Sequence, residues 1–310
     1  GTGQGNRGCV VITSGRADRT PLRRLIELLG ARVLDLEGLE VAGCAAETRW
    51  ALEDLRPDFM LILGDRFEIL AAAAQATVAK VPIAHIHGGE LTLGSFDDGI
   101  RHALTKLSHV HFVAHPDYAA RVRRMGERNV HVVGAPGLDN IVDLPPISRG
   151  QNLVVTYHPP TRGACDPLAL VRALRGFPII WTGVNNDPGA DKVRQAFDGI
   201  PESTFTPREY FLTCRHAAAV VGNSSSGIIE APFLGVPTVN IGSRQAGRLK
   251  GPSIIDCEET EESITAAILK ALAYTGPFDN PYGGPGASQR IADILNGMEW
   301  SQLLQKPWSW

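Results

Sequence analysis

The feature of this sequence that most limits its fold is a steady alternation of short apolar runs and longer helical stretches. Runs such as CVVIT (9–13) and FMLIL (59–63) are almost wholly apolar, and helical patterns such as residues 66–80 separate them. Strands that are buried on both faces read as unbroken apolar runs, whereas strands with one wet face alternate apolar and polar residues. The alternation therefore predicts an α/β fold in which helices cover both faces of parallel sheets.

The same pattern predicts the limits of several elements. Pro21 and Gly30 bound one helical stretch, so we expect a helix that has Pro21 in its first turn and stops at Gly30. A second helix is predicted over residues 46–58, and a short strand near residues 203–205. Each longer apolar run is expected to be one strand of a sheet.

The alternation is interrupted at residues 143–151, where DLPPISRGQ combines two prolines with polar residues. Such a stretch is typical of a linker. We predict a Rossmann-like domain over residues 1–144, a Rossmann-like nucleotide-binding domain over residues 145–285, and a helix over residues 286–310 that packs back on the first domain. Two doubly wound domains of this kind are expected to face a cleft, because ligands of open α/β sheets bind beyond the carboxyl ends of the strands.

Composition excludes several classes of partner. The formal net charge is −3, so no overall basic field favours nucleic acid or an anionic membrane surface. The longest apolar runs fall well short of the ~20 residues that span a bilayer. The five cysteines are scattered and form no CxxC pair, which favours reduced thiols and a cytoplasmic protein.

Carboxylates gather at two of the predicted strand ends. Asp65 follows the run FMLIL within GDRFE, and Glu90 ends the motif HGGE. Asp97 and Asp98 open the next helix, and Arg101 follows in its first turn. Each aspartate also suits a helix cap, although capping needs only one residue at each helix. Several carboxylates near Arg and His suit proton transfer to and from carbon or oxygen.

Two HxH patterns, His85/His87 and His109/His111, resemble the ligand pairs of metal sites. Alternate residues of a strand share a face, so each pair is expected to present both rings together. The first pair closes a strand whereas the second opens one, which places the two pairs at different levels. We therefore expect histidines of the core or of hinges, and no bound metal.

The strongest local signal is GNSSSGIIE (222–230), where a strand runs into a glycine and a helix begins. Backbone N–H groups and hydroxyls at such a helix start bind a diphosphate. The candidate ligands are Asn223, Ser224, Ser225, Ser226 and Gly227. Glu230 lies one turn beyond Ser226, placed to accept hydrogen bonds from ribose hydroxyls.

Three further residues near strand ends each admit two interpretations. Arg16 is either a phosphate donor or a surface arginine, His158 is either ligand-facing or structural, and Asn185 is either a recognition residue or part of a turn. The sequence contains no Walker motif, no GxGxxG after the first strand and no GxSxG elbow. A nucleotide-diphosphate ligand without a redox cofactor is therefore favoured.

Four segments together resemble the hydrolysing UDP-N-acetylglucosamine 2-epimerases: LILGDRFEILAAA, IAHIHGGELTLGSFDDGIRHALTKLSHVHFVA, VVGAPGLDNI and GNSSSGIIEAPFLGVPTVNIGSRQAGR. That family makes N-acetylmannosamine for sialic acid, and its relatives act on UDP-diacetylbacillosamine or a GDP-linked sugar. The resemblance implies the two-domain glycosyltransferase-B architecture and no metal or NAD. It also implies removal of the sugar C2 proton, anti elimination of UDP to a glycal, and hydration that releases the C2-inverted free sugar.

The resemblance implies roles for individual residues. Asp65, Glu90, Asp97 and Asp98 form the proton-transfer set, and His158 faces the leaving diphosphate. Substrate contacts are expected from Arg16, Arg66, Glu68, Arg101, His158, Asn185, Asn223, Ser224, Ser225, Ser226, Gly227, Glu230, Arg244 and Gln245. Residues 19–54 are fewer than the family carries at this place, and residues 36–50 look like a compressed substitute.

Three alternatives to the hydrolysing epimerase stay open. They are a non-hydrolysing 2-epimerase, a glycosyltransferase of the same fold, and a binder of nucleotide sugars with impaired catalysis. The dense carboxylates around Glu90 and Asp97 disfavour the transferase. Apolar helices such as residues 69–79 are expected to pack a homodimer or tetramer.

Overall fold

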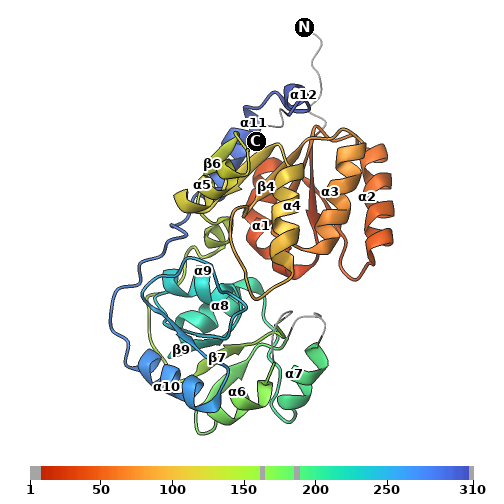
Figure 1. Ribbon diagram of the computed structural model, residues 1–310. Helices are drawn as coiled ribbons and strands as arrows, with labels where there is room; N and C mark the ends of the chain where they lie inside the picture. Colours follow the sequence, from red (N-terminus) through yellow and green to blue (C-terminus); the bar gives the residue numbers. More distant parts are fainter. Residues whose placement is uncertain (1–7, 161–164, 185–188, 307–310) are drawn as a thin grey trace. The chain divides into compact units, whose positions relative to one another are not determined.

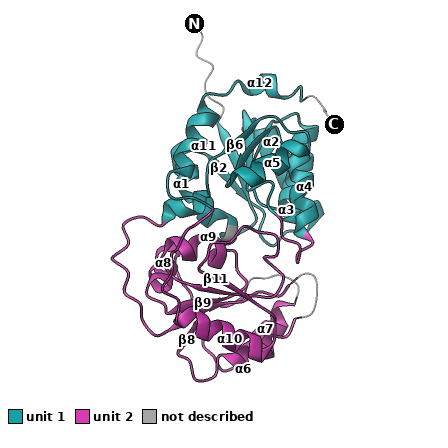
Figure 2. Ribbon diagram, turned by 60° about the vertical axis from the view of Figure 1, so that its left-hand side comes forward, with its two compact units in different colours: residues 1–90, 97–140, 282–310 teal, residues 91–96, 141–281 magenta. Residues whose placement is uncertain are grey.

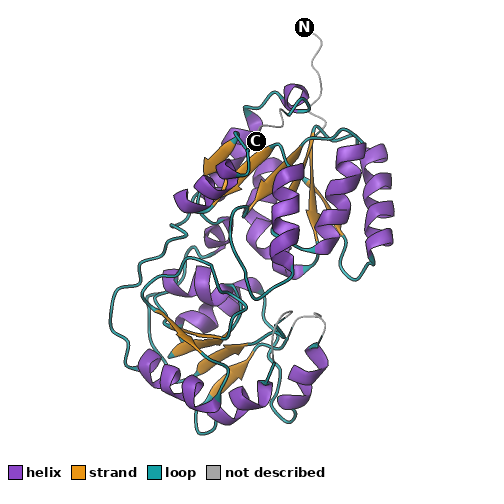
Figure 3. Ribbon diagram, viewed as in Figure 1, coloured by secondary structure: helices purple, strands orange, loops and turns teal. Residues whose placement is uncertain are grey.

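The structure is a computed structural model that describes residues 8–160, 165–184 and 189–306 (Figure 1). The chain forms two compact units, coloured separately in Figure 2. The first unit comprises residues 1–90, 97–140 and 282–310, and the second comprises residues 91–96 and 141–281. Each unit is a parallel sheet with helices packed on it, so the predicted α/β class with two doubly wound units is confirmed (Figure 3).

The first unit is built on a six-stranded parallel sheet in the order β2-β1-β3-β4-β5-β6. Its strands are β1 (Cys9–Thr13), β2 (Arg32–Asp35), β3 (Phe59–Leu63), β4 (Ile83–Ile86), β5 (Val110–Val113) and β6 (Val130–Val132). Its helices are α1 (Arg16–Leu29), α2 (Val41–Leu55), α3 (Phe67–Val78), α4 (Asp97–Leu107), α5 (Pro116–Arg124), the 3-10 helix η1 (Pro136–Asn140), α11 (Ala287–Asn296) and α12 (Trp300–Leu303).

Both faces of this sheet are buried, which explains the unbroken apolar runs. Val11 and Leu61 point to one face, where they form a cluster with residues of α1 and α11. Their neighbours Val10 and Met60 point to the other face, into a cluster with α2, α3 and α4. Successive side chains of a strand alternate between faces, so a strand covered on both sides needs apolar residues at every position.

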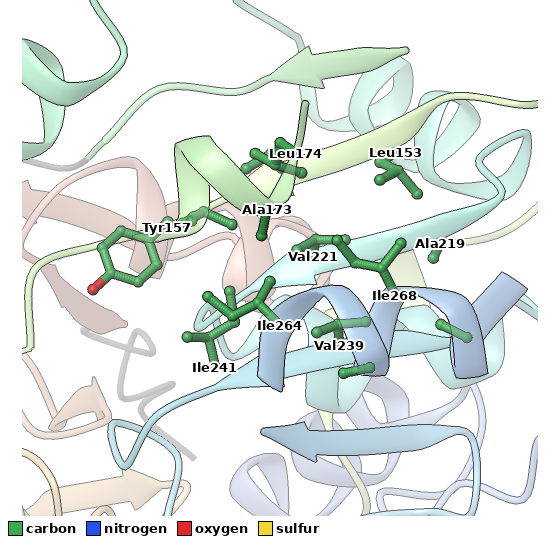
Figure 4. Close-up of a cluster of buried hydrophobic side chains, with 14 of the residues drawn as sticks. Leu153, Tyr157, Ala173, Leu174, Ala219, Val221, Val239, Ile241, Ile264 and Ile268 are labelled. Carbon is green, nitrogen blue, oxygen red and sulfur yellow. The ribbon is translucent and has the colours of Figure 1, made fainter. Parts of the chain in front are cut away.

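The second unit is built on a five-stranded parallel sheet in the order β11-β10-β9-β7-β8. Its strands are β7 (Leu153–Thr156), β8 (Ile179–Trp181), β9 (Ala219–Gly222), β10 (Thr238–Ile241) and β11 (Ile254–Cys257). Its helices are α6 (Pro167–Ala173), α7 (Ala190–Ala196), α8 (Pro207–Arg215), α9 (Ser226–Phe233) and α10 (Glu261–Leu272). Leu153, Val221, Val239 and Ile268 meet in the core between this sheet and α10 (Figure 4).

Three predictions about individual helices and strands are wrong. Helix α1 begins at Arg16, so Pro21 lies inside the helix rather than in its first turn. A proline there removes one bond of the helical ladder, and the buried apolar face of α1 offsets that loss. Helix α2 begins at Val41 instead of residue 46 and takes up most of residues 36–50. Near residues 203–205 the structure has a single bridge, between Trp181 and Glu202, in place of a strand.

Residues 282–310 belong to the first unit, where α11 packs against α1. Ile291 and Leu295 of α11 are fully buried members of its core. The Asp139 carboxylate accepts hydrogen bonds from the N–H groups of Gly286 and Ser288, the second at 2.6 Å. A carboxylate at a helix N-terminus satisfies N–H groups that have no partner within the helix.

The segment Leu91–Phe96 is grouped with the second unit, although the sequence analysis placed it in the first domain. The Leu93 N–H donates to the Ala246 carbonyl at 2.9 Å. Gly94 makes this packing possible, because a Cβ at that position would lie 2.2 Å from the Ser243 carbonyl oxygen. The six residues that separate Glu90 from Asp97 therefore rest on the loop that carries Arg244 and Gln245.

All five cysteines are free thiols. Among the described residues, no helix is both long and apolar enough to cross a bilayer.

Candidate active site

The carboxyl ends of β1, β3 and β4 carry the candidate acid groups of the first unit. These strands are neighbours in a parallel sheet, so the residues that follow them meet at one edge. Asp65 follows β3, and Glu90 follows β4 by four residues. Asp98 lies in the first turn of α4, which is the next helix along the chain.

Arg101 of α4 joins three of these groups. Its guanidinium is 1% exposed and forms an ion pair with the Asp65 carboxylate. It also donates to the Asp98 carboxylate and to the Glu90 carbonyl, both at 3.1 Å. A buried guanidinium is costly unless its donors are satisfied, so this arrangement fixes the three acceptors relative to one another. His102 approaches the second oxygen of Asp98 at 3.6 Å.

Asp65 is not the cap of the helix that follows it. The residue at the N-cap position of α3 is Arg66, and no side chain there accepts a capping hydrogen bond. Arg66 instead makes two hydrogen bonds to the Glu68 carboxylate, at 3.2 and 3.3 Å. The interpretation of Asp65 as the cap of α3 is therefore wrong.

Glu90 is fully buried and is paired with His87. Its Oε1 lies 2.6 Å from His87 Nδ1. His87 has φ of 64°, a left-handed conformation that is unusual outside glycine and that clusters at functional sites. Gly89 is also left-handed, and a Cβ there would lie 2.4 Å from the Tyr118 carbonyl oxygen. The HGGE turn is therefore strained and closely packed, and it fixes the positions of a buried carboxylate and the imidazole paired with it.

The other histidines of the HxH patterns have protein partners of their own. His87 lies beyond the end of β4, so the expectation that it shares a face with His85 is wrong. His85 Nε2 bonds to the Gly64 carbonyl at 2.8 Å, and burial lowers its pKa to about 3, which keeps it neutral. His109 accepts from the Ile83 N–H at 3.1 Å, and His111 lies 3.0 Å from Glu127. The described residues contain no group of three metal-ligating side chains.

Asp18, in the first turn of α1, is a buried carboxyl that was not predicted from the sequence to belong to the site. It accepts the N–H of Ser14 at 2.8 Å and the hydroxyl of Ser14 at 2.5 Å. Burial raises the pKa of Asp18 to about 6, although the Ser14 hydrogen bonds and Arg66 act in the opposite direction. The charge of Asp65 raises it further, which places Asp18 within electrostatic range of the acid cluster. A carboxyl with a perturbed pKa beside other acids is typical of an active site.

We expect Asp18→Asn to stabilise the protein at pH 7 but not at pH 4. The pKa of Asp18 is higher in the folded chain than in the unfolded chain, so the folded state binds more protons between about pH 4 and 6. Stability from this group is therefore present below pH 4 and is lost as the pH rises through 6. A shift of this size corresponds to roughly 2–3 kcal/mol. Asparagine keeps an acceptor for Ser14, and melting temperatures at the two pH values measure the difference; equal shifts at both would contradict the assignment.

In the second unit, the turn before α9 carries the predicted diphosphate ligands. Ser224 and Ser225 precede the helix, and the Ser224 hydroxyl accepts the N–H of Ser226 at 3.3 Å. The hydroxyl of Tyr210 in α8 donates to Ser226 Oγ at 3.0 Å. The hydroxyl hydrogen of Ser226 therefore remains able to donate to another group. Gly227 fits closely against β10, since a Cβ there would lie 2.8 Å from Thr238. Glu230 is one turn further along α9 and half-buried.

Asn223 links this turn to the other predicted ligands. Its side chain binds both the N–H and the carbonyl of His158, at 2.8 and 2.7 Å. Its own carbonyl accepts from Arg244 at 3.2 Å and from Gln245 at 2.9 Å. Gln245 is 2% exposed, and its Oε1 has no hydrogen-bond partner within the described ranges. An unpaired buried amide oxygen is costly, and water or a bound molecule is the usual partner of such an atom.

The predicted site residues thus fall into two groups. Asp65, Glu90, Asp98 and Arg101 come together in the first unit, with Asp97 half-exposed as the first residue of α4. His158, Asn223, Arg244 and Gln245 come together in the second, beside the start of α9. Arg16 is exposed at the first position of α1, and Asn185 lies outside the described residues.

Three residues of these groups were not predicted from the sequence. His87 was predicted to be a core or hinge histidine rather than a metal ligand, although its spacing of three residues from Glu90 within a glycine turn indicated the pairing. Asp18 resembles an ordinary residue of a helix first turn, and only its burial distinguishes it. Tyr210 is distant in sequence from Ser226, and no local pattern predicts their contact.

Comparison with known proteins identifies the family of this chain. A family model described as UDP-N-acetylglucosamine 2-epimerase matches residues 40–296. The UDP-N-acetylglucosamine 2-epimerase of Neisseria meningitidis serogroup B is 34% identical over 82% of this chain and 75% of its own length. The UDP-N,N'-diacetylbacillosamine 2-epimerase (hydrolyzing) of Legionella pneumophila has the same identity and coverage.

Solved structures share the fold at low sequence identity. The Staphylococcus aureus MnaA–UDP co-structure has a TM-score of 0.78 at 14% identity, over 97% of this chain and 99% of that one. The UDP-GlcNAc 2-epimerase of Neisseria meningitidis bound to UDP-GlcNAc has a TM-score of 0.74 at 15% identity, over 93% and 99%. Since the family model covers most of the chain, the protein described here belongs to the UDP-N-acetylglucosamine 2-epimerase family.

Proposed function

We propose that the protein is a hydrolysing nucleotide-sugar 2-epimerase. Its substrate is UDP-N-acetylglucosamine or a related UDP- or GDP-linked 2-acetamido sugar, and its products are the free nucleotide diphosphate and the free C2-inverted sugar. The observation that carries the proposal is the buried Arg101 with its bonds to Asp65, Asp98 and the Glu90 backbone. These bonds hold the acids in fixed positions, as proton transfer requires.

The chemistry requires such a set. The C2 proton of a sugar is a weak acid, so a positioned carboxylate must remove it while the C1–O bond to the diphosphate breaks. The resulting glycal has a double bond between C1 and C2. Water then adds its hydroxyl to C1, and a proton reaches C2 from the face opposite to the one that was deprotonated. Two proton-transfer groups on opposite sides of the sugar are therefore needed, and Asp65 and the Glu90–His87 pair are the candidates.

The second unit supplies the groups that hold the leaving diphosphate. The turn before α9 offers hydroxyls and N–H groups at a helix N-terminus, where an anion is favoured. Arg244 adds a guanidinium beside that turn. The diphosphate gains charge as it departs, so donors fixed in advance lower the barrier to elimination. Hydrolysis as the outcome is supported by relatives whose names carry it, those of Legionella and Campylobacter.

Product analysis tests the proposal. The protein is incubated separately with UDP-N-acetylglucosamine, UDP-diacetylbacillosamine and its GDP counterpart, and the products are followed by NMR. We expect free nucleotide diphosphate and a free C2-inverted sugar from one of the three. An epimerised sugar that stays attached to UDP would identify a non-hydrolysing epimerase. Tight UDP binding without turnover of any of the three would identify a binding protein.

A further inference from the structure

The side chain of Asn223 is buried and bonds to the backbone of His158. The residue is 2% exposed, its Oδ1 accepts the N–H of His158 at 2.8 Å, and its Nδ2 donates to the His158 carbonyl at 2.7 Å. These two bonds need a donor and an acceptor side by side, which among side chains of this size only a primary amide provides. Asn223 was predicted to contact the substrate, and in the structure its amide bonds to the backbone of His158.

The backbone of Asn223 connects two more strand ends. Its N–H donates to the Thr156 carbonyl at 3.2 Å, at the end of β7. Its carbonyl receives Arg244 and Gln245, which lie in the loop after β10. Gly222 allows this approach, because a Cβ there would lie 1.9 Å from the Thr156 carbonyl oxygen. One residue at the end of β9 therefore joins loops that follow both neighbouring strands.

We propose that Asn223 is a positioning residue whose carboxamide fixes the backbone of His158, and through it the direction in which the imidazole meets the diphosphate. This inference rests on the proposed function, in which the diphosphate is the leaving group. Bonds to both polar groups of one residue restrict its φ and ψ, and so restrict the direction of its side chain. A donor aimed at developing charge is most effective when it is fixed before the reaction.

The arrangement also separates two effects of changing Asn223. The bonds from Arg244 and Gln245 go to the main-chain carbonyl, so a side-chain substitution leaves them possible. The bonds to His158 use the side chain alone. We therefore expect a side-chain variant at position 223 to change catalysis through His158. The bonds that hold the loop after β10 should persist in that variant.

A double-mutant cycle between Asn223→Asp and His158→Ala tests this. Aspartate keeps the size of the side chain and an acceptor for the His158 N–H, but it places an oxygen against the His158 carbonyl. We expect Asn223→Asp alone to lower kcat/KM by about 100-fold. In the His158→Ala background, the same change should lower kcat/KM by less than about 3-fold, because the imidazole that it misplaces is gone. Thr265→Val, which removes one side-chain bond in α10 of the same unit, is the control and should have wild-type kcat/KM.

A merely structural role of Asn223 would also change the melting temperature, so Tm is measured together with kcat/KM. The bonds to the backbone exist with or without the imidazole, so Asn223→Asp should lower Tm equally in both backgrounds. Equal losses of kcat/KM in both backgrounds, or wild-type kcat/KM in Asn223→Asp, would overturn the inference. Turnover by the wild-type protein tests the proposed function separately. If no sugar is turned over, the same cycle measured as the Kd for UDP by calorimetry still decides the role of Asn223.

Discussion

Glu90→Gln is expected to lower kcat by at least ~1000-fold while changing the Kd for UDP by less than ~3-fold. Glu90 is fully buried, and its Oε1 lies 2.6 Å from His87 Nδ1. Glutamine has nearly the same shape and can still bond to the imidazole, so the fold is expected to persist. It cannot accept or release a proton at neutral pH, and general acid–base catalysis contributes ~10²- to 10⁴-fold to rate. Steady-state kinetics and calorimetry with UDP measure the two quantities.

The matched control is Glu53→Gln, which removes the same charge from an exposed position on α2. Its side chain is 71% exposed, and we expect wild-type kcat and wild-type UDP affinity. If Glu90→Gln keeps kcat within ~10-fold of wild type, the proton-transfer role of the Glu90–His87 pair is wrong.

Asp65→Asn is expected to abolish measurable turnover, with a drop of ~1000-fold or more in kcat, and also to destabilise the fold. The carboxylate is paired with Arg101, whose guanidinium is 1% exposed. Loss of the charge leaves that buried cation with Asp98 as its remaining carboxylate partner within the described cluster. Breaking a buried pair costs up to about 3–5 kcal/mol, and the 24% exposure of Asp65 places this case at the lower end.

Measurement of the unfolding free energy separates the two effects of Asp65→Asn. At a temperature well below its Tm the variant should be folded and should bind UDP normally, yet remain inactive. Asp54→Asn, at an exposed position of α2, is the control for removal of a negative charge. A folded Asp65→Asn protein with near wild-type kcat would show that Asp65 only stabilises Arg101.

The fold could be predicted because strands of a sheet that is buried on both faces need apolar residues at successive positions, and such runs are visible in the sequence. Val10 and Val11 both had to be apolar, since they enter different cores, and the same holds for Met60 and Leu61. The start of α1 could not be predicted. Pro21 is a common first-turn residue, but the positive φ of Gly15 (123°), which glycine tolerates, allows the helix to begin five residues earlier, just after β1.

The site could be predicted in part. Motifs placed Asp65, Glu90 and the Asn-Ser-Ser-Ser turn at strand ends, and parallel topology brings together the residues that follow strands of the same sheet. The sequence could not indicate that Arg101 is the shared partner of Asp65 and Asp98, because that depends on the packing of α4 beside the end of β3. It also could not distinguish a ligand contact from the internal amide bonds of Asn223, since both require the same residue.

The most direct test of the account follows the hydrogen at C2 of the sugar. The reaction is run in deuterated water with the nucleotide sugar that is turned over, and the free sugar is examined by NMR. If carboxylates of the first unit remove the C2 proton and solvent supplies its replacement, the product carries one deuterium at C2 and has the inverted configuration there. A free sugar that keeps its original hydrogen and configuration at C2 would contradict the account, because the diphosphate would then have left without any proton transfer at carbon.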